Sequence, residues 1–176
     1  MRVTNPRNII CSISGLREGS LSIDYFKDVK ESEIFHKALE NIAKKRGDLG
    51  SNYKKYYDFI QPVFEGNEHF NKKLLYLACV LSHMDWGLGA FQKAELVFQE
   101  TINTPLLRLT HKERIQLALS CYWRYCSIKY NPKMEYLTFL NNNEIFSSKQ
   151  VGAALRFSQS LTSISTIFLE EFKLYK

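Results

Sequence analysis

Residues 68–84, EHFNKKLLYLACVLSHM, form the most apolar stretch of the chain and decide its fold class. Leucines recur there at intervals of three and four residues, and further apolar residues lie beside that stripe, which predicts a widely buried helix. The longest apolar run, Leu74 to Leu81, is far shorter than the roughly 18 residues that a membrane-spanning helix needs. We therefore expect a central core helix and no membrane partner.

Helical spacing continues on both sides of this stretch. Asp28 with Glu31, and Thr110 with Glu113, have the spacing of capping boxes at helix starts, whereas Gly47 and Pro62 are typical of helix ends. We expect Ser148 to cap the last helix. The predicted helices cover residues 28–46, 51–61, 68–84, 91–102, 110–130, 133–140 and 148–158.

The first 25 residues have a different pattern. Residues 2–21 alternate weakly between apolar and polar and then reach Gly15 and Gly19, which predicts a strand, a turn and a second short strand. The expected fold is therefore mainly α, a helical bundle with a short N-terminal β-like arm. We expect this arm in residues 1–25 and the helical domain in residues 26–176.

Composition and the N-terminal sequence indicate the class of protein and its location in the cell. With 45% hydrophobic and 24% charged residues in 176, the chain has the composition of a globular protein. The N-terminus has no apolar segment typical of a signal peptide, so we expect a cytoplasmic location. The four cysteines form no C-x-x-C spacing, and we expect small buried side chains. They are Cys11, Cys79, Cys121 and Cys126.

The sequence predicts neither a catalytic residue nor a metal site. His83 and Asp85 are separated by Met84, so on a helix they point about 200° apart and cannot face one ion. No nucleophile elbow or phosphate-binding loop occurs. The net charge of +6 favours a polyanion as partner, but lysines and arginines are spread along the chain, which disfavours a nucleic acid.

Four segments, in order along the chain, resemble the C-terminal part of the exopolyphosphatase and guanosine pentaphosphate phosphohydrolase family. The run Ser14 to Gly19 (SGLREG) resembles the end of the second actin-like domain of that family. The later segments resemble its helical His-Asp-like domain: residues 78–82 with Trp86 and Glu95, residues 111–125, and residues 152–157. The sequence departs from the family at His83 and at the loop of residues 87–90.

The resemblance implies a helical bundle of the degenerate His-Asp phosphohydrolase-like type. In the family, the catalytic groups and the magnesium site lie in the actin-like domains, so it implies no catalytic residue and no cofactor in this chain. It also implies an accessory role in binding polyphosphate or a guanosine polyphosphate and in forming a homodimer. We expect four arginines to contact phosphate: Arg17, Arg114, Arg124 and Arg156.

A second function stays open at this stage. The chain is alternatively a non-enzymatic interaction module, either a truncated relic or a partner that docks on a separately encoded actin-like core. An exposed apolar patch around Leu16, Leu21 and Ile23 would then form the interface.

Overall fold

The computed structural model describes residues 31–45, 52–66, 70–83, 87, 89–106, 109–130, 134–162, 169, 172 and 174. These residues confirm the mainly helical prediction, and no strand occurs among them. The β-like arm expected in residues 1–25 lies outside them. The helices are α2 (Glu31–Lys45), α3 (Asn52–Ile60), the 3-10 helix η1 (Gln61–Phe64), α4 (Lys72–Leu81), α5 (Ala90–Asn103), α6 (His111–Tyr125), α7 (Met134–Leu137) and α8 (Asn142–Thr162).

Side chains cap the starts of the two helices with the strongest sequence signals. Thr110 Oγ1 accepts a hydrogen bond from the backbone N–H of Glu113, and the Glu113 carboxylate accepts one from the Thr110 N–H at 2.8 Å. The predicted capping box of α6 is thereby confirmed. Asn71 caps α4 by accepting bonds from the backbone N–H groups of Lys73 and Leu74. The apolar helix therefore begins at Lys72, later than predicted.

The prediction for the start of the last helix was wrong. The helix α8 begins at Asn142, because Asn141 and Glu144 form a reciprocal capping box with bonds of 2.9 and 2.8 Å. Ser148 lies inside the helix, where its hydroxyl donates to the Glu144 carbonyl one turn earlier. Asparagine with a glutamate three residues later is as good a start signal as serine, so the asparagine run opens α8.

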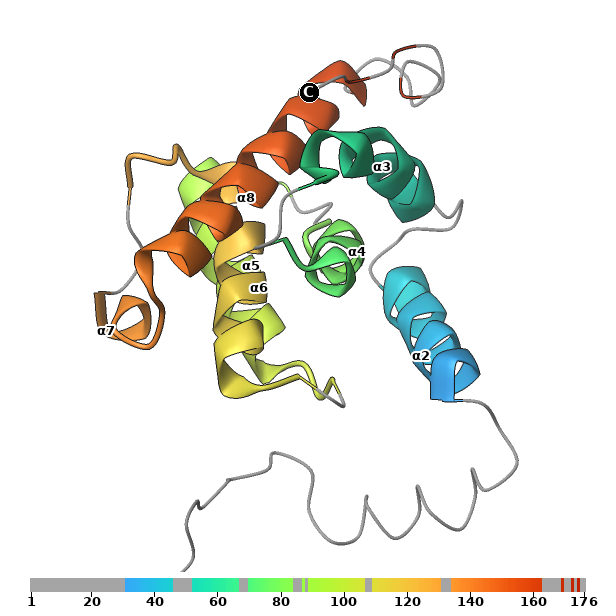
Figure 1. Cartoon of the computed structure of the whole chain (residues 1–176), viewed down its shortest axis with the longest axis horizontal. Coiled ribbons are helices and arrows are strands. Elements are labelled where there is room, and N and C mark those ends of the chain that lie inside the picture. Colours follow the sequence, from blue (N-terminus) through green and yellow to red (C-terminus); the bar gives the residue numbers. More distant parts are fainter. Residues whose placement is uncertain are drawn as a thin grey trace, which may run out of the picture.

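Contacts join α4, α6 and α8 at their starts and again at their ends, so the three helices share a chain direction, although α8 crosses α6 obliquely (Figure 1). At their starts, Asn71 of the α4 cap donates to the Glu113 carboxylate of α6, and Lys112 of α6 lies 3.9 Å from Glu144 of α8. At their ends, Arg124 of α6 reaches both the α4 cap and the last turns of α8. We call α4, α6 and α8 the parallel trio, where parallel refers to this shared chain direction and not to aligned axes.

The centre of the molecule is α6 and not the more apolar α4. The chain from Arg114 to Tyr125 is buried at every position except Gln116, which is half-buried. It packs on α4, α5 and α8. Two arginines and a serine lower the hydrophobicity of α6, so its sequence looks like that of an amphipathic helix with one exposed face. Their hydrogen bonds allow it to be buried on all sides.

The remaining helices cover the trio. The end of α5 lies beside the start of α6, since Arg114 donates to the Leu106 carbonyl, and the two helices run in opposite directions. The helix α3 packs on α4 and α8, and α2 packs on α4. Edge-on contacts of Tyr53 and Tyr57 with Tyr76 hold α3 against α4.

Gly152 sets how closely α8 approaches α6. A Cβ at this position would lie 2.6 Å from Trp123 Cβ and 2.9 Å from the Ser120 carbonyl oxygen. Both are parts of the chain that cannot rotate away. The two helices therefore touch almost backbone to backbone at this point.

We predict that Gly152→Ala destabilises the protein by about 2 kcal/mol, because the added methyl group overpacks a rigid contact. Urea unfolding measures this change. The neighbouring Ala153 is exposed, so Ala153→Ser is the matched control and should change stability by less than about 0.5 kcal/mol. Equal stability of the two variants would show that α6 and α8 separate easily here.

Candidate functional site

Arg124 is a buried cation at the end of the parallel trio where the three helices finish. Its side chain is 1% exposed. Nη1 donates to the hydroxyl of Ser82, the C-cap residue of α4, at 2.6 Å, and Nε donates to Gln159 Oε1 of α8 at 3.0 Å. Nη2 is buried and has no hydrogen-bond partner among the described residues.

The surroundings of this guanidinium offset part of the cost of burying its charge. The last turns of α4, α6 and α8 present the negative ends of three helix dipoles to it. The rings of Tyr56 and Tyr125 lie 5.6 and 5.5 Å from its central carbon, at distances typical of cation–π contacts. None of the described carboxylates forms an ion pair with Arg124. We infer that Arg124 holds the three helix ends together.

Arg114 has an equivalent task near the other end of α6. It is 5% exposed and donates to the carbonyls of Ile102, Thr104 and Leu106, where α5 ends. Burial lowers the pKa of this guanidinium from its usual value. A cation suits the C-terminal end of a helix, so Arg114 satisfies carbonyls that α5 leaves open.

The structure does not bring the predicted phosphate ligands together. Arg114 and Arg124 lie ten residues apart on α6, about 15 Å along its axis. Both give their hydrogen bonds to the protein. Arg156 is exposed on α8, and Arg17 lies outside the described residues. Of the four arginines predicted to contact phosphate, Arg156 alone is seen to face solvent in the described part of the chain.

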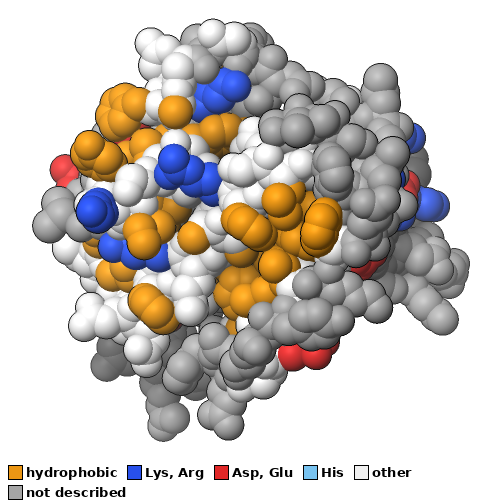
Figure 2. All heavy atoms as spheres, turned by 90° about the horizontal axis from the view of Figure 1, so that it is seen from above, with side chains coloured by type: hydrophobic (Ala, Val, Ile, Leu, Met, Phe, Trp, Pro, Cys, Tyr) orange, Lys and Arg blue, Asp and Glu red, His pale blue; other side chains and the backbone are white. Residues whose placement is uncertain are grey.

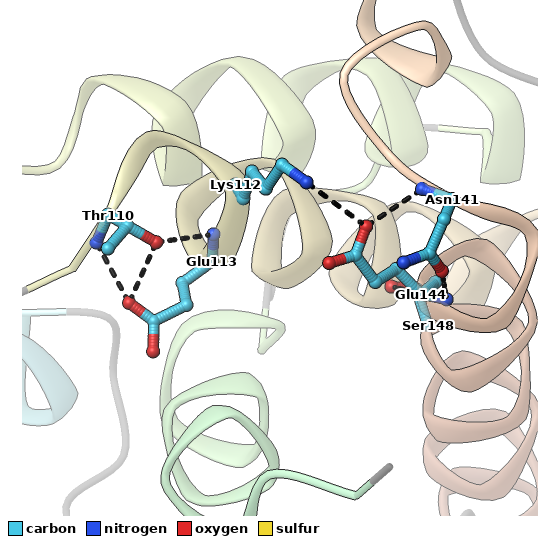
Figure 3. Close-up of polar contacts among 6 residues, drawn as sticks. All are labelled: Thr110, Lys112, Glu113, Asn141, Glu144 and Ser148. Carbon is cyan, nitrogen blue, oxygen red and sulfur yellow. Dashed lines mark hydrogen bonds and ion pairs between the residues drawn. The ribbon is translucent and has the colours of Figure 1, made fainter. Parts of the chain in front are cut away.

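The opposite end of the trio carries the acidic groups (Figure 3). Glu113 bonds the Thr110 cap and accepts from Asn71, while Glu144 bonds the Asn141 cap and pairs with Lys112. These carboxylates lie at helix starts, where the dipole favours negative charge. A small pocket between the helices lies just beyond them. It is lined by Phe70, Asn71, Leu74, Gln116, Ser120, Ser147, Ser148 and Val151.

The described residues contain no cluster of three or more side chains of the His, Cys, Asp and Glu types that could hold a metal ion. His83 is half-buried after the end of α4, and Asp85 lies outside the described residues.

Three thiols are buried, as predicted: Cys79, Cys121 and Cys126. Burial raises the pKa of Cys79 well above its usual range, and the Arg124 charge only partly counters it. Burial likewise raises the pKa of Cys126, whose backbone N–H donates to the Tyr122 carbonyl. Cys11 lies outside the described residues.

Several large apolar side chains are exposed on the described surface. Phe146 and Phe157 of α8 are 61% and 49% exposed. The others are Phe91, Ile128, Tyr130, Phe139 and Phe172. On the face in Figure 2, hydrophobic side chains lie among lysines and arginines, and acidic side chains lie toward its margin. Phe146 and Phe157 are eleven residues apart, which is three turns of one helix. This spacing is a sequence signal for a second apolar stripe on α8 that the prediction from sequence did not use.

No protein-family model and no curated protein sequence matches this chain. Among the described helices, none combines the length and apolar character needed to cross a membrane.

Arg124→Ala should destabilise the protein by about 3 kcal/mol, because it leaves a cavity and removes the donor from the buried Ser82 hydroxyl and the half-buried Gln159 amide. Arg156→Ala should change stability by less than about 0.5 kcal/mol, since that side chain is exposed. Denaturant unfolding of both variants measures the difference. Similar small losses for the two would show that Arg124 does not hold the helix ends.

Buried thiols with raised pKa values should resist modification. In a Cys11→Ser variant at pH 8, we expect a disulfide reagent to label none of the three described cysteines in the folded protein. In guanidinium chloride it should label all of them. Rapid labelling of the folded protein would contradict the burial of these side chains.

Proposed function

We propose that this chain is a C-terminal helical domain of an exopolyphosphatase-like phosphohydrolase, of the degenerate His-Asp-like type. In this proposal it assists polyphosphate binding and dimerisation and is not catalytic alone. One observation carries the proposal. The three described segments that resemble the family lie on α4, α6 and α8, the helices that form the parallel trio.

Direct contacts join these segments. Ser82 of the first segment bonds to Arg124 of the second at 2.6 Å. Gly152 of the third packs against Trp123 of the second, with no room for a Cβ. Residues about 30 to 40 positions apart in the sequence thus form one structural unit. A folding requirement shared with the family would account for their resemblance.

The proposed polyanion contact is on α8. Arg156 and Lys149 are seven residues apart, so they lie on the same side of the helix about 10 Å from each other. Arg156 is exposed and Lys149 half-buried, with its ammonium 5.3 Å from the Trp123 ring centre. Guanidinium and ammonium groups at the surface bind phosphoryl oxygens through charge-assisted hydrogen bonds. Arg114 and Arg124 act in this proposal only by holding the helices.

The phosphohydrolase chemistry is assigned to actin-like domains supplied by another chain or another part of the protein. In the resembling family, magnesium belongs to those domains. The proposal places no hydrolytic step and no metal on the described helices, which supply binding surface to the substrate polyanion.

Calorimetric titration with long-chain polyphosphate at low and at moderate salt tests the binding role. We expect micromolar binding that survives moderate salt and that weakens by about tenfold in the Lys149→Ala, Arg156→Ala double variant. Lys37→Ala, Lys54→Ala is the matched control. It removes two exposed charges from α2 and α3 and should weaken binding only slightly.

Two results would overturn this assignment. Binding that disappears at moderate salt would indicate a diffuse basic surface without specific phosphate contacts. Equal losses in the two double variants would show that α8 has no special part in binding.

A further inference from the structure

We propose that the outer face of α8 binds an acidic amphipathic helix of a protein partner. We define this outer face as Phe146, Lys149, Ala153, Arg156 and Phe157. It combines apolar side chains with cations, and this combination goes beyond a polyanion contact, because a polyphosphate chain gains nothing from phenylalanine. A partner that buries both kinds of group must itself be amphipathic.

The apolar part of the outer face is a straight ridge. Phe146, Ala153 and Phe157 project within about 40° of one another around the helix, and the ridge is about 16 Å long. The two phenylalanines are 61% and 49% exposed. The opposite side of the same helix is buried through Val151, Leu155 and Ser158. The ridge is therefore a second apolar stripe on a helix whose first stripe already packs on the core.

The charge along this ridge has one sign. Lys149 and Arg156 lie on one flank, about 60° to 80° around the helix from Phe146. The only acidic residue of α8 is Glu144, and its carboxylate is used in the helix cap and in the pair with Lys112. A partner with carboxylates along one flank of its own stripe would complement this arrangement.

A second copy of this chain fits the outer face poorly. In an antiparallel pair related by a twofold axis, the basic flanks of both α8 helices fall on the same side of the interface. Lysine and arginine would then face each other across it. In a parallel pair they would face the flank of Gln150, which is neutral. Neither arrangement supplies a carboxylate to the two cations.

The length and spacing of the ridge indicate a helix as the occupant. Apolar positions separated by seven and four residues match the stripe of an amphipathic helix laid along α8. Three turns suffice for such a contact.

A displayed library of amphipathic helical peptides, with all charges randomised, tests the proposal on the full chain. We expect enriched peptides to carry glutamate or aspartate on one flank of an apolar stripe. Their binding should weaken by about tenfold in Phe146→Ser, Phe157→Ser. Phe91→Ser, which removes an equally exposed ring from α5, is the control and should leave binding unchanged.

Charge reversal gives a second readout. When the same peptide library is selected for binding to the Lys149→Glu, Arg156→Glu variant, peptides with basic flanks should be enriched. The proposal is overturned if no peptide class is enriched, or if the enriched peptides bind the phenylalanine variants as tightly as the original chain. Self-association in sedimentation that is lost in Phe146→Ser, Phe157→Ser would also overturn it, because the face would then bind a second copy. Polyphosphate binding is measured separately and should not change in the phenylalanine variants.

Discussion

The rest of the fold depends on a guanidinium buried where the ends of three helices meet. Arg124 joins the last turn of α6 to Ser82 at the end of α4 and to Gln159 near the end of α8. The Tyr56 ring, which approaches it from α3, also bonds through its hydroxyl to Thr162. A single side chain therefore fixes the relative positions of four helices, and without it their ends would need another source of positive charge.

The two ends of the parallel trio carry opposite charges. Carboxylates cap the starts of α6 and α8, and arginine closes the ends, so fixed charges at both ends complement the helix dipoles. Neighbouring helices that share a chain direction repel one another through their dipoles, and opposite charges at their ends offset this repulsion. This effect accounts for the charged residues at both ends of α6, which otherwise lies in the centre of the molecule.

Much of the fold could be predicted from periodicity and caps. Thr110 with Glu113 marked the start of α6 correctly, and the apolar spacing found α4 and α5. The prediction misses the start of α8 because it places the cap at Ser148, although Asn141 with Glu144 forms a start signal seven residues earlier. The site was less predictable. Whether an arginine is buried depends on what neighbouring helices offer it, so Arg114 and Arg124 could not be distinguished from the exposed Arg156.

Gly152 has one more consequence. Because α8 rests on α6 with backbone against backbone, its outward side is held by the core itself and not by a layer of mobile side chains. A ligand that binds this surface does not have to order the backbone of α8 first, so conformational entropy is lost on association by the outward side chains alone. The rigid contact between α6 and α8 therefore lowers the entropy cost of binding a ligand on the outer face of α8.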